Sequence, residues 1–437
     1  MGRVALVLQL AALAACAAQA MAARTAVMLE SLDMQQTHSK FFQLLTARGH
    51  ALEFFSNDPE LALEQYGVRT FDNLVVFSPQ KKLGKLGKSD LLHFVETGGN
   101  VLLASSTKLT KVQRDFALEC GVEYEKKGNL VMDHVAPIKD AGDIYNSVIA
   151  ATDFVKADRV VGAKLASNSA SKKPVAFSGL GMTLEPNNVL GFHALEITTK
   201  VVESDLLFGN EIGLVTAVQA RNNARLVFAG SLDLFSDKYF TDAFSNALFS
   251  DAVTKWGFQE SGVLRATNVQ HHREDGSKPD KMLKDSQRAD QPLTLYPDAE
   301  IARDSLVYRV KDNLTYSFDI HELKDGKWAP FAASDVQLEF VMLDPHVRKT
   351  MTHDGKGHFS VTFEAPDTYG IFLFRVMYRR LGLSTIHSAT QVSLRPYKHD
   401  EYERFIPAAY PYYVSAFSMM VGVFVFSVFF LFYHEKK

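Results

Sequence analysis

The chain has 437 residues, a formal net charge of −3, a hydrophobic fraction of 47% and a charged fraction of 22%. This composition excludes a largely disordered protein, and the balanced charge gives no reason to expect nucleic acid as a partner. With about 150 residues per domain as a guide, the length predicts two or three domains.

The N-terminus predicts a cleaved secretory signal peptide at residues 1–20. Residues 1–3 supply a positive start, residues 4–17 form an apolar run, and residues 18–20 have the small-x-small pattern that a signal peptidase requires. An uncleaved N-terminal anchor is the alternative, although an alanine-rich run of this length is short for a bilayer span. Cys16 would leave with this segment, so Cys120 would remain as a lone thiol without a disulfide partner. We expect Cys120 to be a buried structural thiol, with a redox or intermolecular role as the alternative.

Residues 21–261 alternate between predicted strands and helices. The apolar runs predict strands at residues 25–29, 52–55, 74–77 and 101–103, and helices at 38–48 and 89–96, the latter with Ser89 as its N-cap. This alternation is typical of βαβ units and predicts an α/β domain with a mostly parallel, Rossmann-like or flavodoxin-like sheet.

The later part of this region is also mixed. Residues 214–229 predict a hairpin around Asn222-Asn223, and helical spacing follows over residues 239–256. These elements either complete the first α/β domain or form a second subdomain.

From residue 262 to residue 400 the hydrophobic period changes to two. Short alternating strands recur between polar turns, for example Tyr316, Phe318 and Ile320 with polar residues between them. This pattern predicts an antiparallel β-sandwich. Residues 271–291 are polar, lysine-rich and without periodicity, so we expect a loop or linker there.

The C-terminus predicts one membrane anchor. Residues 414–433 contain no charged side chain, and twenty residues of helix reach about 30 Å, the thickness of the hydrocarbon core. Tyrosines lie in the juxtamembrane segment 401–413 and at residue 433, where aromatic rings meet headgroups. The lysines of the short tail, residues 434–437, favour the cytoplasm. We therefore expect a single-pass type I topology with the bulk of the chain lumenal.

Within the predicted span, Ser415, Ser418 and Gly422 lie on one helical stripe. Small side chains let two helices approach closely, so this stripe is predicted to face a partner helix, with plain lipid exposure as the alternative.

No catalytic, metal or cofactor site is predicted. The sequence offers neither a nucleophile elbow nor a Cys/His pair at metal-ligand spacing, and the adjacent His271-His272 suit a polar loop better than a metal site. The lysines at positions 81, 82, 85 and 88 could hold an anion, but a solvated basic loop is the simpler interpretation. Asn313-Leu314-Thr315 is a candidate glycan acceptor.

Several longer motifs resemble one specific family, the 48-kDa subunits of oligosaccharyltransferase. The likeness extends from about residue 25 to the end of the span. It is carried by Phe71-Asp72-Asn73-Leu74-Val75-Val76-Phe77-Ser78-Pro79, Gln219-Ala220-Arg221-Asn222-Asn223-Ala224-Arg225, Gly230-Ser231-Leu232-Asp233, Gly262-Val263-Leu264-Arg265, Tyr402-Glu403-Arg404-Phe405-Ile406-Pro407 and Ala409-Tyr410-Pro411-Tyr412-Tyr413.

The resemblance implies a non-catalytic subunit of an endoplasmic-reticulum membrane complex. In that family the complex transfers a preassembled oligosaccharide from dolichyl diphosphate to asparagine in Asn-X-Ser/Thr, which is protein N-glycosylation. The active site and its divalent metal belong to a multi-spanning subunit. The 48-kDa subunit serves assembly, and its implied partners are that catalytic subunit and the ribophorin-type subunits, in a hetero-oligomer. The tail departs from the dilysine retrieval spacing, because no residues follow Lys436-Lys437.

Two other classes of function stay open at this point. One is a membrane-tethered surface binding module, which the topology and the sandwich would suit. The other is a tethered lumenal hydrolase, which would need a carboxylate pair or an activated Cys120.

Overall fold

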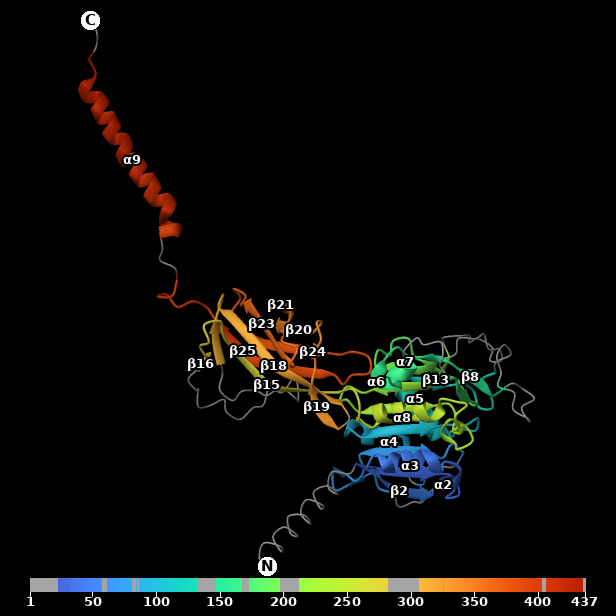
Figure 1. Cartoon of the computed structure of the whole chain (residues 1–437). Coiled ribbons are helices and arrows are strands. Elements are labelled where there is room, and N and C mark those ends of the chain that lie inside the picture. Colours follow the sequence, from blue (N-terminus) through green and yellow to red (C-terminus); the bar gives the residue numbers. More distant parts are fainter. Residues whose placement is uncertain are drawn as a thin grey trace, which may run out of the picture.

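The computed structural model describes residues 23–56, 61–80, 84, 86–132, 138, 147–166, 173–196, 212–281, 306–324, 326–402 and 406–434. The predicted signal peptide, Lys81, Lys82, Lys85 and the last three tail residues lie outside these ranges. An α/β domain and a long C-terminal helix lie at opposite ends of a β-sandwich (Figure 1).

The first half of the α/β domain is a parallel sheet, as predicted. Its inner strands are buried on both faces because helices cover both, and their sequences are accordingly almost continuously apolar, whereas the edge strand is partly exposed. In spatial order they are β2 (Ala51–Ser56), β1 (Arg24–Leu29), β5 (Asn73–Phe77), β6 (Asn100–Ala104) and β14 (Arg225–Ala229).

Helices pack on the two faces of this sheet. Alternate residues of β1 separate the two cores, since Val27 packs with α3 and α8, and Met28 packs with α4 and α5. The helices are α2 (Met34–Thr37), α3 (Ser39–Ala47), α4 (Lys88–Glu96), α5 (Lys111–Glu119) and α8 (Asn246–Gly257). Ser89 is not the N-cap of α4: Gly87 is, and its backbone N–H donates to Asp90 Oδ2 at 2.8 Å.

The second half of the sheet is antiparallel. The predicted hairpin is confirmed as β13 (Gly213–Gln219) and β14, and it joins the two halves. The remaining elements are β7 (Val122–Tyr124), β9 (Asp153–Phe154), β11 (Met182–Leu184), β12 (Gly191–Glu196), the pair β8 (Ile149–Ala151) and β10 (Val175–Phe177), the pair β3 (Glu64–Gln65) and β4 (Val68–Arg69), α6 (Asp158–Val161), α7 (Ala163–Ala166) and the short η2 (Asp233–Phe235).

The helix predicted over residues 239–256 is shorter than expected. Helix α8 begins only at Asn246, because the segment before it is held in turns. The Ser245 backbone N–H donates to Pro174 O at 2.9 Å, and the Asn246 amide exchanges hydrogen bonds with the backbone of Ala176. Tertiary contacts therefore override the helical spacing of the aromatic residues here.

The sandwich has two sheets that enclose one aromatic-rich core. The first sheet contains β15 (Val263–Arg273), β18 (Asn313–Lys324), β19 (Lys327–Pro330), β22 (Thr352–His353) and β23 (His358–Glu364). The second contains β16 (Asp280–Lys281), β17 (Leu306–Arg309), β25 (Ile386–Arg395), β24 (Gly370–Tyr378), β20 (Gln337–Val341) and β21 (Pro345–Thr350). All pairs are antiparallel as predicted, except that β17 runs parallel to β25.

The loop predicted over residues 271–291 begins later than expected. Residues 271–273 belong to β15, residues 274–279 form a turn and loop as predicted, and residues 282–291 lie outside the described ranges. His271 lies in β15, stacks on Phe374 with ring centroids 5.2 Å apart, and its Nδ1 lies 2.7 Å from the Tyr308 hydroxyl. Burial lowers the pKa of His271 to about 4. A register shift between Thr267 and Gln270 changes which side chains face inward, so period-two alternation could not be followed through this strand.

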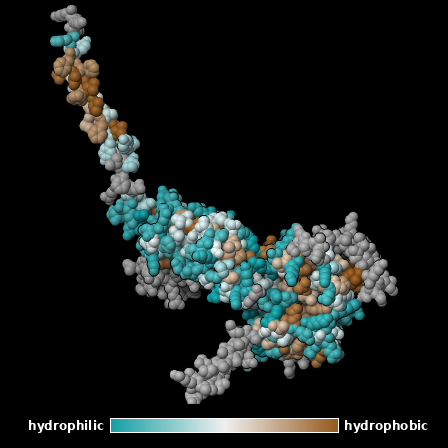
Figure 2. All heavy atoms as spheres, viewed as in Figure 1, coloured by the Kyte–Doolittle hydropathy of each residue, from teal (hydrophilic) through white to brown (hydrophobic). Residues whose placement is uncertain are grey.

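The C-terminal helix α9 (Ile406–Phe432) begins before the predicted span and includes most of the predicted juxtamembrane segment. Its portion Ala409–Phe432 has the length and hydropathy of a transmembrane helix. Figure 2 shows apolar side chains gathered along this helix, whereas the visible face of the sandwich is mostly hydrophilic.

Candidate functional site: the two ends of the sandwich and the anchor

The carboxyl ends of the parallel strands are where an α/β sheet usually places a ligand site. Ser105 and Ser231 follow β6 and β14 there, and their hydroxyls donate to Ala229 O and Ser178 O. The Gln113 amide donates to Ser78 O at 2.7 Å. In the part of the chain that the structure describes, these side chains hold loops together, and neither serine contacts a base.

Cys120 is the residue on which a cysteine-hydrolase function would depend. It lies directly after α5 and is only partly exposed. Burial, together with the neighbouring Glu119 carboxylate, raises the pKa of the Cys120 thiol to about 12. Because the thiolate is the nucleophile, this environment suppresses the reactivity of the thiol.

One end of the sandwich joins the α/β domain through a fully buried cation. The Arg225 guanidinium donates to Trp256 O at 2.8 Å, to Ser261 O at 2.6 Å and to Gly262 O at 2.8 Å. It also stacks on the Trp256 ring, 4.8 Å from the centroid, and the Trp256 indole donates to Gly382 O at 3.0 Å. Burial lowers the pKa of Arg225 to about 9, so it remains charged at neutral pH.

The turn between β13 and β14 strengthens the same junction. Asn223, in the left-handed region with φ of 66°, donates from Nδ2 to Thr385 O at 3.1 Å and accepts from Thr385 N at 2.7 Å. Two bonds to one residue act like a strand pairing between the domains. Gly262 is also constrained, since a Cβ there would lie 2.2 Å from Gly382 O. We call this set of contacts the domain junction.

An ion pair and a cavity complete the domain junction. Arg159 of α6 forms an ion pair with Glu322 of β18, whose side chain is only 1% exposed. A cavity of about 320 Å³ lies at the same junction between the two domains. Its lining comprises residues 189–192, Gln219 and residues 379–383.

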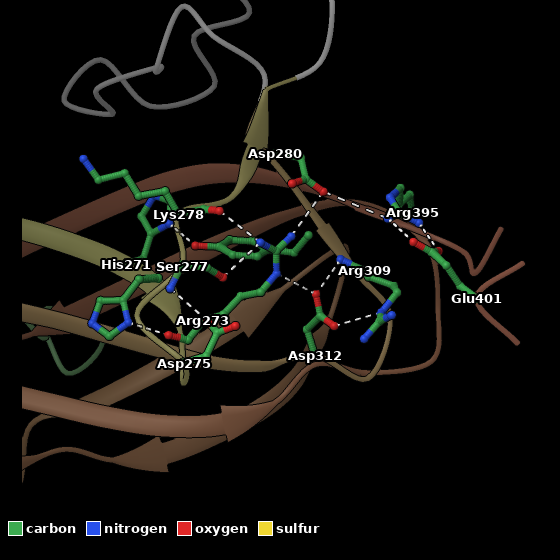
Figure 3. A network of polar contacts seen from close by, with 12 residues as sticks. His271, Arg273, Asp275, Ser277, Lys278, Asp280, Arg309, Asp312, Arg395 and Glu401 are labelled. Atoms are coloured by element: carbon green, nitrogen blue, oxygen red, sulfur yellow. Dashed lines mark hydrogen bonds and ion pairs between the residues drawn. The ribbon is translucent and has the colours of Figure 1, made fainter. Parts of the chain in front are cut away.

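The opposite end of the sandwich carries a network of ion pairs, shown in Figure 3. Asp312, nearly buried, accepts from Arg273 Nε at 3.0 Å and from Arg309 Nε at 3.0 Å. Asp280 lies 3.2 Å from Arg273 and 4.0 Å from Arg395. These contacts connect β15, β16, β17 and β25 at the end of the sandwich from which the chain leaves for α9.

The last pair in this network fixes the segment that leads to the anchor. Arg395 binds Glu401 with both terminal nitrogens, at 2.5 and 2.7 Å, and the Lys398 backbone N–H donates to Glu401 at 2.9 Å. The hydrogen bond with Arg395 is the main reason that the pKa of Glu401 falls to about 2. We call Arg395 and Glu401 the anchor clamp.

Ser415, Ser418 and Gly422 all lie in α9, and the two serine hydroxyls are satisfied within the helix. Ser415 donates to Tyr412 O and Ser418 to Ser415 O, both at 2.8 Å, and nothing in the described chain lies near a Cβ built on Gly422. The stripe therefore offers a close-approach surface rather than free hydroxyl donors.

The other singled-out residues lie apart from one another. Asn313 is the first residue of β18, exposed, and its amide donates to Glu274 at 2.8 Å. Lys88, the described member of the lysine cluster, binds Glu119 at 2.6 Å. No pattern in the sequence marked Arg225, Asn223 or the anchor clamp as residues that join domains, although Asn223 and Arg225 lie within one of the family-like motifs.

Comparison with known proteins gives a consistent answer over the α/β domain, most of the sandwich and the anchor. The model of the N-terminal domain of OST48 matches residues 16–260, which is more than half of the chain, and that of the OST48 middle domain matches residues 296–434. The chain belongs to the OST48 family.

Three relatives carry the name 48-kDa subunit of dolichyl-diphosphooligosaccharide–protein glycosyltransferase. The protein of Danio rerio is 38% identical over 95% of this chain and 92% of its own length. That of Drosophila melanogaster is 37% identical over 95% and 92%, and that of Arabidopsis thaliana is 36% identical over 94% and 93%. The family resemblance expected from the motifs is therefore confirmed, and the chain is a member of a glycosyltransferase subunit family.

Proposed function

We propose that this chain is a non-catalytic scaffold subunit of oligosaccharyltransferase, the complex that transfers an oligosaccharide from dolichyl diphosphate to asparagine. In this proposal residues 21–400 are lumenal in the endoplasmic reticulum, residues 414–433 cross its membrane once, and the four-residue tail is cytoplasmic. Its partners are the multi-spanning catalytic subunit and the ribophorin-type subunits. No cofactor is assigned to this chain.

The observation that carries the proposal is the placement of the buried and paired charges. In the described part of the chain, Arg225 joins two domains and Arg395 holds the segment that leads to the membrane helix. Neither lies beside a nucleophile, and the described His, Cys, Asp and Glu residues form no group of three that could hold a metal. These charges position domains relative to a membrane, which is the task of a scaffold.

The test is purification of the full tagged chain in mild detergent, followed by identification of co-purifying proteins and assay of glycan transfer to an acceptor peptide. We expect a multi-spanning glycosyltransferase and activity in the complex, and no activity when this chain is isolated. Cys120→Ser should leave transfer unchanged. Transfer or hydrolysis by the isolated chain would overturn the scaffold proposal and favour an enzyme. Recovery of the chain with none of these partners would favour a surface binding module.

We also propose that Ser415, Ser418 and Gly422 face a partner helix in the membrane. Ser418→Ile together with Gly422→Ile adds bulk to the stripe and should reduce co-purification of partner subunits. Ser427→Ile is the matched control, because Ser427 also bonds within the helix, to Val423 O, but lies off the stripe. Equal recovery of partners with both variants would assign the stripe to lipid.

A further inference from the structure

Exposed apolar side chains gather at the end of the sandwich from which the chain leaves for the anchor. Leu343 is 98% exposed, Tyr369 68% and Ile371 59%. The segments that carry them are in contact, because Gly370 lies between Tyr369 and Ile371, Met342 precedes Leu343, and a Cβ on Gly370 would lie 2.7 Å from Met342 Sδ. Isolated exposed apolar residues are ordinary, but a group at one end of a domain marks a contact surface.

Strand register places this group on the same end of the same sheet as the anchor clamp. Gly370, at the start of β24, pairs with Leu394, the neighbour of Arg395. The turn that holds Leu343 follows Val341, which pairs with Leu373. Tyr402 is 57% exposed, and its ring contacts that of Tyr397 at 5.4 Å. The exposed apolar side chains therefore follow the end of one sheet from β25 to β20. We call Leu343, Tyr369, Ile371 and Tyr402 the sandwich tip.

The anchor clamp keeps the sandwich tip close to the membrane helix. Glu401 is held on Arg395, and only residues 402–405 separate it from Ile406, the first residue of α9. Ile406 is five residues from Glu401, and a fully extended chain covers at most about 17 Å over that separation. The other end of the sandwich is occupied by the domain junction, so the sandwich tip is the end that stays near the bilayer.

The side chains of the sandwich tip match the chemistry of the lipid headgroup layer. Tyrosine rings concentrate at the membrane–water boundary, where one part is apolar and the hydroxyl is wet. Charges of both signs lie close in the chain to the sandwich tip or the anchor clamp, namely Asp344, Asp367 and Lys398, and they suit zwitterionic headgroups better than a strongly anionic surface.

We propose that the sandwich tip lies in the headgroup layer of the bilayer, with Leu343, Tyr369 and Ile371 as its apolar contacts. Together with α9 this second contact fixes the tilt of the sandwich. Since the ten residues of β25 span about 30 Å, the sandwich would hold the α/β domain about that far from the headgroup layer. The proposal depends on α9 crossing a membrane. It does not depend on the scaffold role, so the two can fail separately.

The native tryptophans make a direct test possible. The chain has two, and both lie at the far end of the sandwich: Trp256 is buried in the domain junction, and Trp328 pairs with Leu323. Along β18, Leu323 is about 30 Å from the first residue, Asn313, at the tip end. Quenching of these two by brominated lipid should therefore be small.

The experiment uses the full chain, alone, in phosphatidylcholine nanodiscs whose lipids are brominated near the headgroup end of the acyl chain. Tyr369→Trp and Leu343→Trp each add a tryptophan at the sandwich tip. Tyr66→Trp, at a fully exposed tyrosine of the α/β domain, is the control. We expect the tip variants to be quenched several-fold more than the control, with emission shifted to the blue.

Two results would overturn the proposal. In one, the tip variants are quenched no more than Tyr66→Trp, which would leave the sandwich tip in water. In the other, their emission shifts only after partner subunits are added and bromine has no effect, which would make the tip a protein contact.

Discussion

Each end of the sandwich is attached to a neighbouring element through charged side chains, which are buried at one end and partly exposed at the other. At the domain junction Arg225 is fully buried and its three hydrogen bonds go to backbone carbonyls. At the anchor clamp Glu401 is partly exposed, and it accepts hydrogen bonds from the Arg395 side chain and from the Lys398 backbone N–H. A buried charge contributes by satisfying groups that have no other partner, whereas a solvated pair contributes little and is screened by salt.

The domain junction is therefore a permanent attachment, whereas the anchor clamp is an adjustable one. Removing a partner at the domain junction leaves carbonyls without donors in a dry interior. Removing one partner of the anchor clamp leaves the other exposed to water, which can hydrogen-bond it instead. The following experiments test this difference, from the largest expected effect to the smallest.

Arg225→Met should have the largest effect. It keeps much of the apolar stem but leaves Trp256 O, Ser261 O and Gly262 O unpaired, so the free energy of unfolding should fall by about 3–5 kcal/mol. Urea denaturation of the purified chain measures this change. Arg24→Met, at the exposed pair with Glu53, is the control and should be nearly neutral. If the free energy of unfolding fell equally in the two variants, the buried arginine would contribute no more than the solvated one, and the prediction would be wrong.

Trp256→Phe should weaken the domain junction without destroying it. The ring packing largely remains, but the hydrogen bond to Gly382 O is lost, at a cost of about 1–3 kcal/mol because the carbonyl is buried. Limited proteolysis should then cut faster in residues 379–385. Trp328→Phe is the control, since Trp328 is half-exposed at the same end of the sandwich. Unchanged cleavage would show that the indole hydrogen bond does not hold the domains together.

Glu401→Gln should release the linker to the anchor without changing the unfolding midpoint of the domains. The measurement is hydrogen exchange of the Lys398 amide, which donates to Glu401, corrected for the intrinsic effect of pH. In the unchanged chain the pKa of Glu401 is lowered from 4.5 to about 2. Protection should therefore be complete above pH 4.5 and disappear as the pH falls toward 2, because protonation removes the charge that Arg395 binds.

High salt should also reduce this protection, while the domain junction stays unaffected. Glu53→Gln, at an exposed pair outside the anchor clamp, is the control. If Lys398 exchange were independent of pH and salt, the linker would be held by something other than the ion pair.

Asn313→Gln should have the smallest structural effect and reports on topology. If this part of the chain is lumenal, the unchanged protein should lose apparent mass on treatment with an N-glycosidase, and the variant should not. Thr315→Ser should keep the glycan and Thr315→Ala should lose it. Asn313→Gln should retain the native unfolding midpoint, because Asn313 is exposed. No glycan on the unchanged chain would remove Asn313 as an acceptor.

Much of the fold follows from local patterns in the sequence. The apolar runs of β1, β5 and β6 are buried on both faces, and the alternation in β18, β23 and β24 matches their burial. Local patterns failed where distant contacts decide. Ser89 looked like a helix cap, but Gly87 precedes it with a suitable backbone, and the turns before α8 are fixed by Pro174 and Ala176.

The candidate sites divide in the same way. The membrane helix and its small-residue stripe depend on neighbouring residues, so composition and spacing are enough to predict them. His271 and Arg225 were not predictable as buried groups, because one lies beyond a bulge and the other is a charged residue at the start of a strand, directly after a turn. Their burial depends on partners such as Phe374 and Trp256 that are far away in the sequence.

The sequence by itself determined the family, the order of α/β domain, sandwich and anchor, and the absence of a recognised catalytic motif, because these rest on periodicity and short motifs. Only the tertiary structure decided which charges are buried, which end of the sandwich meets each neighbour, and that Leu343, Tyr369 and Ile371 lie at the end from which the chain leaves for the anchor. Strand register brings residues together over long separations in the chain, and no local signal records that pairing.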